Sequence, residues 1–138
     1  MRLPTLQRAR DERGAAAVEF ALVLPLLVLL VFGIAWFSLG FNRKQGLQAA
    51  AREGARLGAL PQSTRTDITD KINAALAGVL PTSAPRTITI SPSGTRPCDL
   101  QPPNARVSVT VSAPYTYSIP LFGNRTTTLT GKGVFRCE

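Results

Sequence analysis

The stretch RGAAAVEFALVLPLLVLLVFGIAWFSLGF, from Arg13 to Phe41, decides the fold of this 138-residue chain. Residues 20–39 carry no charge. As a helix rising 1.5 Å per residue, they cover roughly 30 Å, the thickness of the hydrocarbon core of a bilayer. The stretch is longer than the apolar part of a cleaved secretory signal, and it ends in aromatic residues such as Trp36 that suit a membrane interface. It therefore predicts a transmembrane helix over residues 15–41 that stays in the membrane.

A single acidic residue, Glu19, lies at the start of the apolar run. A carboxylate costs up to about 2.5–3.5 kcal/mol at the membrane centre and less near the interface, and such residues usually face a partner. Gly14 lies five positions before Glu19, and Phe20 follows it directly. This spacing resembles the type IV prepilin processing site, where a peptidase cuts after the glycine and leaves a glutamate fifth in the mature chain. The alternative is that Glu19 merely interacts favourably with the positive end of the helix dipole.

The resemblance to the processing site assigns roles to four residues. Cleavage between Gly14 and Ala15 would make Ala15 the new N-terminus. The freed amine of Ala15 and the carboxylate of Glu19 would then form a complementary pair between neighbouring subunits. In a medium of low dielectric constant such a pair sets register more than it adds stability. Glu19 and Phe20 are therefore predicted to fix the register between subunits.

The charge of the chain lies mostly after the apolar run. The net charge is +8, and residues 42–138 contribute twelve Lys and Arg against five Asp and Glu. Basic residues flank the apolar run equally, so the positive-inside rule does not decide its orientation. A short N-terminal segment and a pair of cysteines that could bond outside the cytosol favour a cytoplasmic leader, residues 1–14, and an extracytoplasmic domain, residues 42–138. The protein is thus predicted to be a single-pass protein of a cytoplasmic membrane.

The helical pattern continues beyond the membrane run as far as Pro61. Small residues recur every four positions along one face, at Gly46, Ala50, Gly54 and Gly58. Such a stripe lets another backbone approach closely, either the sheet of the same chain, which we favour, or a second subunit. Glu53 and Arg56 are spaced to pair on this helix. Within the membrane run, Pro25 predicts a kink or an unwound turn because it lacks an amide hydrogen.

Two separated motifs together resemble one protein family. The first is ERGAAAVEFA, residues 12–21, followed by a leucine-rich run with an early proline; the second is AAREGAR, residues 50–56. These motifs are similar to those of the TadE-like family. The resemblance implies a minor pseudopilin of a tight-adherence (Flp) pilus apparatus. It also implies partners: a prepilin peptidase, other pilins and pseudopilins, and the pilus assembly platform, besides membrane lipid.

The remaining sequence predicts an α+β domain of pilin-like outline. Residues 66–80 have one apolar face at helical spacing, with Thr66 or Asp67 as the cap. Alternating Val and Thr or Ser then predict short antiparallel strands over residues 87–90, 106–112, 115–119 and 126–135. We expect both helices to pack on a sheet of three to five strands. Cys98 and Cys137 are predicted to form a disulfide that closes a 40-residue loop, worth about 4 kcal/mol from loop entropy.

No motif in the sequence predicts catalysis. The chain has no histidine, and its two cysteines lack the spacing of a zinc site, so we expect no metal, no cofactor and no catalytic residue. The spread of positive charge argues against nucleic acid as a partner. The predicted function is a membrane-anchored pseudopilin cut after Gly14. The alternatives are an uncleaved single-pass protein whose basic ectodomain binds DNA or an anionic surface polymer, and an uncleaved anchor with no assembly role.

Overall fold

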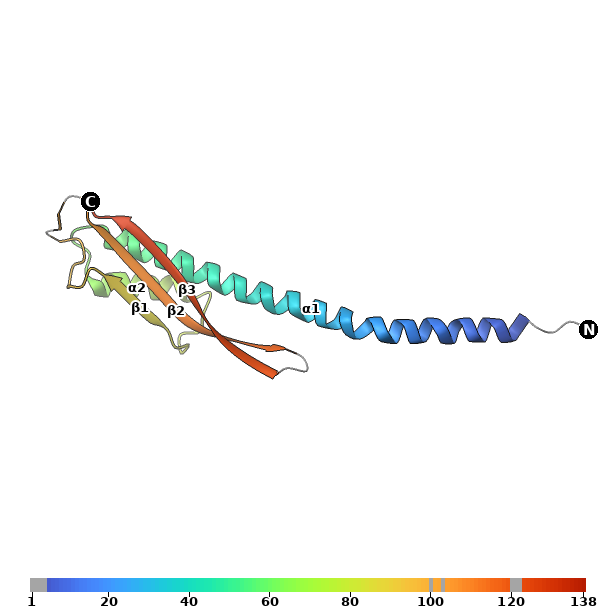
Figure 1. Ribbon diagram of the computed structural model, residues 1–138. Coiled ribbons are helices and arrows are strands. Elements are labelled where there is room, and N and C mark those ends of the chain that lie inside the picture. Colours follow the sequence, from blue (N-terminus) through green and yellow to red (C-terminus); the bar gives the residue numbers. More distant parts are fainter. Residues whose placement is uncertain (1–4, 100, 103, 120–122) are drawn as a thin grey trace, which may run out of the picture.

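The computed structural model describes residues 5–99, 101–102, 104–119 and 123–138, with side chains from residue 14 onward, except that of residue 119. The elements are α1 (Thr5–Gly58), α2 (Arg65–Leu76), β1 (Thr87–Ser91), β2 (Arg106–Ile119) and β3 (Gly123–Arg136). The fold is α+β, with one helix extending far beyond a small domain at its C-terminal end (Figure 1). The sequence predicted this class of fold correctly.

Helix α1 is longer and more regular than the sequence suggested. It begins at Thr5, ten positions before the predicted start at Ala15, because extending an existing helix costs little and residues 5–13 include good helix formers such as Leu, Gln, Ala and Arg. It also continues through Pro25 without an unwound turn. The axis only changes direction gently in its blue part (Figure 1). Loss of one hydrogen bond at Pro25 therefore does not interrupt the helix.

Helix α2 is capped by a residue that the sequence analysis did not choose. The side chain of Thr64 accepts a hydrogen bond from the Asp67 amide, and the Asp67 side chain accepts one from the Thr64 amide. This reciprocal arrangement is a capping box. The prediction of Thr66 or Asp67 as the cap was wrong, although Asp67 takes part. The helix ends at Leu76, earlier than predicted, and the apolar face continues into the following turn through Val79, which packs against the core.

The sheet has three antiparallel strands in the order β1-β2-β3. Two predicted strands, 106–112 and 115–119, are one continuous strand, β2, across Pro114. Strand β1 pairs with β2 only as far as Ser112, so Pro114 lies where that edge of β2 is free of β1. A proline is tolerated at such an edge because no neighbouring strand needs its missing amide hydrogen. The sequence predicted three to five strands, and the described sheet has three.

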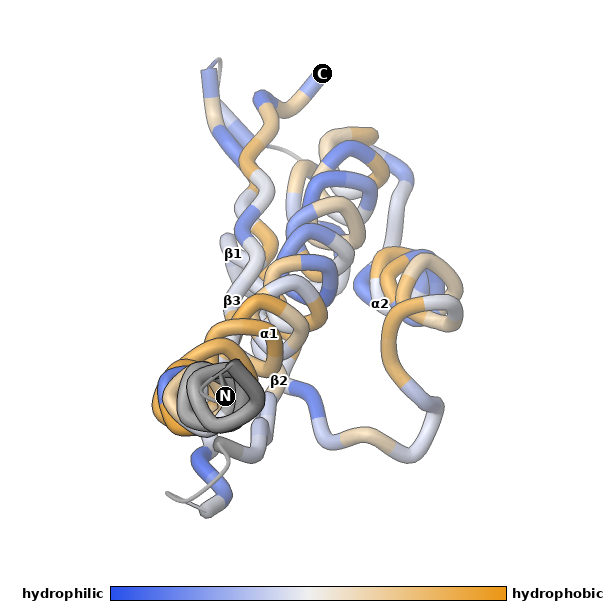
Figure 2. The backbone as a smooth tube through the Cα atoms, turned by 90° about the vertical axis from the view of Figure 1, so that its right-hand side faces the viewer, coloured by the Kyte–Doolittle hydropathy of each residue, from blue (hydrophilic) through white to orange (hydrophobic). Residues whose placement is uncertain are grey.

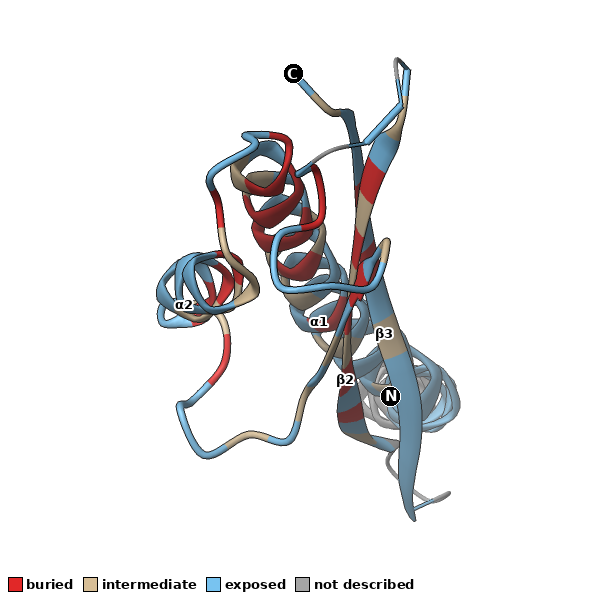
Figure 3. Cartoon of the chain, turned by 90° about the vertical axis from the view of Figure 1, so that its left-hand side faces the viewer, coloured by how far each residue is buried: buried red, intermediate tan, exposed pale blue. Residues whose placement is uncertain are grey.

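The core lies on both sides of the C-terminal half of α1. Figures 2 and 3 show α1 as the middle layer, with α2 on one side and the sheet on the other. The face of β2 that packs on α1 is formed by alternating residues, Val107, Val109, Val111, Ala113 and Tyr115. On the helices, the largest fully buried side chains are Leu47, Ile68, Ile72 and Leu76. The N-terminal half of α1 has no such cover.

Candidate functional site

The N-terminal half of α1 exposes large apolar side chains. Leu22 is 72% exposed and Leu26 is 68% exposed. Within Gly14–Gly58 the helix is long and apolar enough to cross a bilayer, and its most apolar window is not buried by the domain. A soluble protein rarely leaves such a contiguous apolar surface in water. This half of the helix therefore suits a lipid environment or contact with other apolar helices.

The residues of the processing motif lie on this uncovered half of α1. Gly14, Ala15, Glu19 and Phe20 are all helical and exposed, and Ala15 and Glu19 are one helical turn apart. A Cβ atom at Gly14 would meet nothing within 4 Å. Glu19 has no salt bridge to the described side chains. These residues are thus presented to the surroundings, and no part of the described domain covers them.

The helical backbone at Gly14 sets a condition for cleavage. A peptidase that binds its substrate in extended form must unwind this turn of α1. Glycine is about 0.8–1.0 kcal/mol less favourable than alanine in a helix, so Gly14 lowers the cost of unwinding at that point. The glycine therefore suits a processing site even though it lies inside a helix.

The stripe of small residues on α1 packs mainly against α2 and the turn after it, and at Gly58 it also approaches the sheet. A Cβ atom added at Gly54 would overlap Ile72, and one at Gly46 would overlap Val79, just beyond α2. At Gly58 it would come within 2.9 Å of Ile68 and 3.3 Å of Val107. Ala50 is fully buried between these glycines. The expectation that the stripe packs on the sheet was therefore wrong for Gly46 and Gly54, which α2 and the turn after it cover, and holds in part at Gly58.

The sheet approaches α1 through two glycines of β3. A Cβ atom at Gly131 would overlap the backbone of Leu47, and one at Gly133 would overlap that of Ala51. Between them, the Gln48 side chain donates a hydrogen bond to the Lys132 carbonyl at 2.6 Å and accepts one from the Lys132 amide at 3.0 Å. The sequence analysis missed this contact. The two glycines at alternate positions of a strand were the available signal, since glycine in a strand often marks a close backbone approach.

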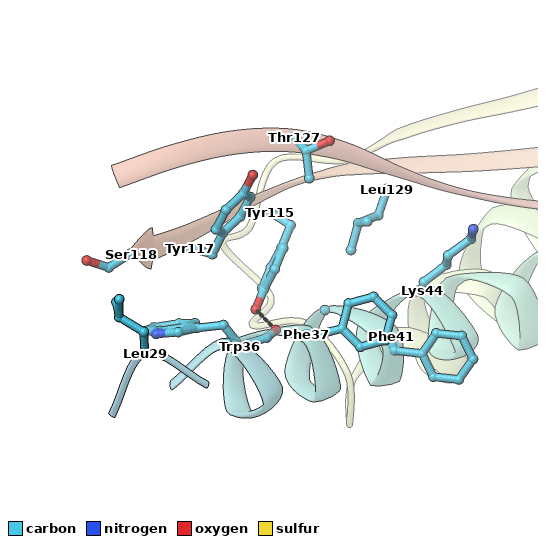
Figure 4. A pocket seen from close by; sticks show the side chains of 12 residues that line it. Leu29, Trp36, Phe37, Phe41, Lys44, Tyr115, Tyr117, Ser118, Thr127 and Leu129 are labelled. Atoms are coloured by element: carbon cyan, nitrogen blue, oxygen red, sulfur yellow. Dashed lines mark hydrogen bonds between the residues drawn. The ribbon is translucent and has the colours of Figure 1, made fainter. Parts of the chain in front are cut away.

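The aromatic residues gather where α1 leaves the domain. Tyr115 of β2 crosses to the helix, and its hydroxyl donates a hydrogen bond to the Trp36 carbonyl at 2.9 Å (Figure 4). A Cβ atom at Gly40 would lie 2.9 Å from the Tyr115 ring, so glycine is needed for this approach. The Arg43 guanidinium carbon lies 5.1 Å from the centre of the same ring. Tyr115 therefore joins the sheet to the helix at the base of the uncovered segment.

A groove of about 640 Å³ opens beside Tyr115, between α1 and the end of the β2–β3 hairpin. Its helix wall includes Leu29, Trp36, Phe37 and Phe41; its hairpin wall includes Tyr117, Ser118, Thr127 and Leu129 (Figure 4). Lys44 lies at the end nearer the domain (Figure 4). The sequence analysis did not find this groove, because its two walls are about eighty positions apart in the chain.

The C-terminus is tied to the far end of α1. Cys98 and Cys137 form a disulfide, with their Cα atoms 5.4 Å apart. The Cys137 amide donates to the Ala105 carbonyl, and the Glu138 amide donates to the Ala59 carbonyl.

Glu53 of α1 forms an ion pair with Lys71 of α2 at 3.4 Å, whereas the sequence suggested Arg56 as its partner. A salt bridge thus links α1 to α2.

Residues 14–56 match the family model described as TadE-like protein. This chain is TadE-like over residues 14–56. The match confirms the resemblance seen in the two motifs, and it indicates a Tad pilus-associated protein with an N-terminal apolar helix. The matched residues begin at Gly14 and end within the buried half of α1, so the match covers neither α2 nor the sheet.

Searches among curated proteins and among solved structures gave no match to this chain.

Proposed function

We propose that this TadE-like chain is a membrane-anchored minor pseudopilin that is cut after Gly14 and takes part in assembly of a tight-adherence pilus. Its role is structural rather than enzymatic. It sits in a bacterial cytoplasmic membrane with its N-terminus in the cytoplasm and its domain outside. Its partners are a prepilin peptidase, other pilins and pseudopilins, and the assembly platform.

One observation carries the proposal: the apolar segment of α1 projects free of its own domain and holds a single carboxylate, Glu19, at its start. The apolar side chains from Val18 to Phe41 are largely exposed, and Glu19 is exposed among them. A charge in such a place is costly unless a partner meets it. The amine released at Ala15 would supply the opposite charge at the start of a neighbouring helix. The match to the TadE-like family over residues 14–56 also supports a pilus-associated role.

Mass spectrometry of the native N-terminus tests the processing step. We expect chains from a host with its prepilin peptidase to begin at Ala15, and chains from the peptidase-deficient host to begin at Met1. A Gly14→Val variant should remain uncut, since a bulky residue at the cleavage position blocks a subsite shaped for glycine. The matched control is Gly33→Val, a helical glycine of the same apolar segment, which should be cut normally. An intact N-terminus in the peptidase-positive host would instead support the uncleaved tethered domain.

A further inference from the structure

The β2–β3 hairpin runs back along α1 toward the membrane. Near the far end of α1, Gly58 lies against Val107 of β2. Further along the strand, the Tyr115 hydroxyl bonds the Trp36 carbonyl. Beyond it, Tyr117 and Ser118 line the groove together with Leu29 and Gly33 of α1. The end of the hairpin therefore lies beside α1 within the uncharged run, residues 20–39.

This position conflicts with a hydrocarbon span over residues 20–39. With that span, the level of Gly33 would be about 9 Å inside the hydrocarbon core. Beyond Ser112, β2 pairs only with β3 in the described part of the sheet, so its other edge is open. The hairpin also carries exposed polar residues such as Thr116 and Arg125. Open sheet edges do not occur in hydrocarbon, because lipid offers their backbone groups no hydrogen-bond partner, and a charged residue there is strongly disfavoured.

We propose that the end of the β2–β3 hairpin rests in the lipid headgroup layer on the side of the folded domain, and that residues 15–33 cross the hydrocarbon. These residues cover about 28 Å as a helix, close to the thickness of a bilayer core. Trp36 and Tyr117 then lie at the interface, where tryptophan and tyrosine are favoured. The proposal rests on membrane anchorage alone, so it holds for the cut and the uncut chain. It also places Glu19 about 6 Å inside the core, where its need for a partner is greater.

The distribution of charge fits this placement. Residues 20–52 contain no Asp or Glu, and neither do residues 100–137. The membrane-facing end of the domain therefore presents cations only, among them Arg43, Lys44 and Arg125. Two acids of the domain lie away from this end: Glu53 pairs with Lys71 of α2, and Glu138 lies beside Ala59. An end with this charge fits anionic phospholipid headgroups.

The single tryptophan, Trp36, reports the depth directly. The test uses the full chain in phosphatidylcholine bilayers with lipids brominated at different positions of the acyl chain, which quench tryptophan according to depth. With residues 15–33 in the hydrocarbon, Trp36 should lie about 18 Å from the bilayer centre. With residues 20–39 it would lie about 10 Å from the centre, and that result would overturn the proposal. A variant combining Trp36→Phe with Phe32→Trp calibrates the depth scale, because its tryptophan should lie about 12 Å from the bilayer centre.

A spin label at Ser118→Cys tests the hairpin itself. The label should collide with a water-soluble nickel chelate, as expected in the headgroup layer. A label reached by oxygen alone would overturn the placement. In phosphatidylglycerol bilayers, Arg125→Gln should raise nickel collisions roughly 1.5- to 5-fold, because one headgroup contact is lost. Arg136→Gln, the same change on the far end of β3, should leave them unchanged, and equal effects of the two substitutions would overturn the assignment to anionic headgroups. Failure of either depth test leaves cleavage after Gly14 unaffected, so the two proposals fail separately.

Discussion

At the scale of single residues, Tyr115 and Gln48 join the sheet to α1 through side-chain hydrogen bonds to backbone atoms. Sequence spacing identified Glu19 as unusual, because a lone carboxylate in an apolar run is conspicuous without any structure. It did not identify Tyr115 or Gln48, whose hydrogen bonds reach residues 79 and 84 positions away. A residue whose role depends on a distant backbone atom has no local signature.

The capping box of α2 gives a prediction about acid stability. The Thr64 hydroxyl, and after it the Thr64 amide, donate hydrogen bonds to the Asp67 carboxylate and hold its pKa below the usual value for an aspartate. The folded chain therefore binds this proton more weakly than the unfolded chain, so the contribution is complete above the unfolded pKa and is lost as pH falls toward the folded one. Asp67→Asn should flatten this part of the pH dependence of α2 stability, measured by hydrogen exchange of α2 amides.

A second substitution separates the cap from the titration. Thr64→Ala should lower the stability of α2 by about 0.5–2 kcal/mol at neutral pH, since the N-cap hydrogen bond is lost. Thr66→Ala, an exposed position of the first turn, is the matched control. Equal losses in the two variants would show that the capping box does not stabilise the helix.

Tyr115 gives a further prediction at this scale. Tyr115→Phe removes only the hydroxyl that bonds the Trp36 carbonyl, and it should cost about 0.5–1.5 kcal/mol. Its effect should be concentrated in exchange of β2 amides near the hairpin end. Tyr117→Phe removes the same atom from a stacked neighbour and should change exchange little. If Tyr117→Phe matched Tyr115→Phe, the bond to α1 would not be what holds the hairpin.

At the scale of elements, periodic patterns predicted the helices and the strand segments, but not their partners. The stripe on α1 was visible as glycine and alanine four apart, yet whether α2 or the sheet lay against it could not be decided locally. The boundaries of α2 and the continuity of β2 were also missed. Both depend on neighbours. The reciprocal hydrogen bonds of Thr64 and Asp67 set the start of α2, and β1 ends opposite Ser112, before Pro114, which leaves β2 free to continue.

The glycines of β3 give the prediction for this scale. Gly133→Ala should destabilise packing of β3 on α1 by about 1–3 kcal/mol, because its methyl group would meet the Ala51 carbonyl, which cannot move away as a side chain would. Gly78→Ala is the control, since a Cβ atom there meets nothing within 4 Å. Hydrogen exchange of β3 amides measures both. A β3 that exchanges equally in the two variants would contradict the close approach.

At the scale of the whole molecule, the chain has two parts. One is a compact domain around the C-terminal half of α1, and the other is the uncovered N-terminal half of the same helix. The sequence predicted this division because hydrophobicity without charge over residues 20–39 needs no tertiary information. It did not predict how far the hairpin returns along α1, which requires the register of two strands against a helix. The position of the hairpin beside α1 is the reason for moving the proposed hydrocarbon span from residues 20–39 to residues 15–33. This move places Glu19 inside the hydrocarbon core, where an unpaired carboxylate costs more.

The central claim is that the N-terminal amine of a neighbouring subunit pairs with the carboxylate of Glu19. Zero-length cross-linking tests this claim most directly. An apolar carbodiimide applied to native membranes or pili joins a carboxylate to an amine only when the two are in contact. We predict a cross-linked peptide pair that joins Glu19 to the N-terminal amine of a processed subunit, and its loss in a Glu19→Gln variant. A Glu19 that forms no such pair, in chains that still assemble, would contradict the account.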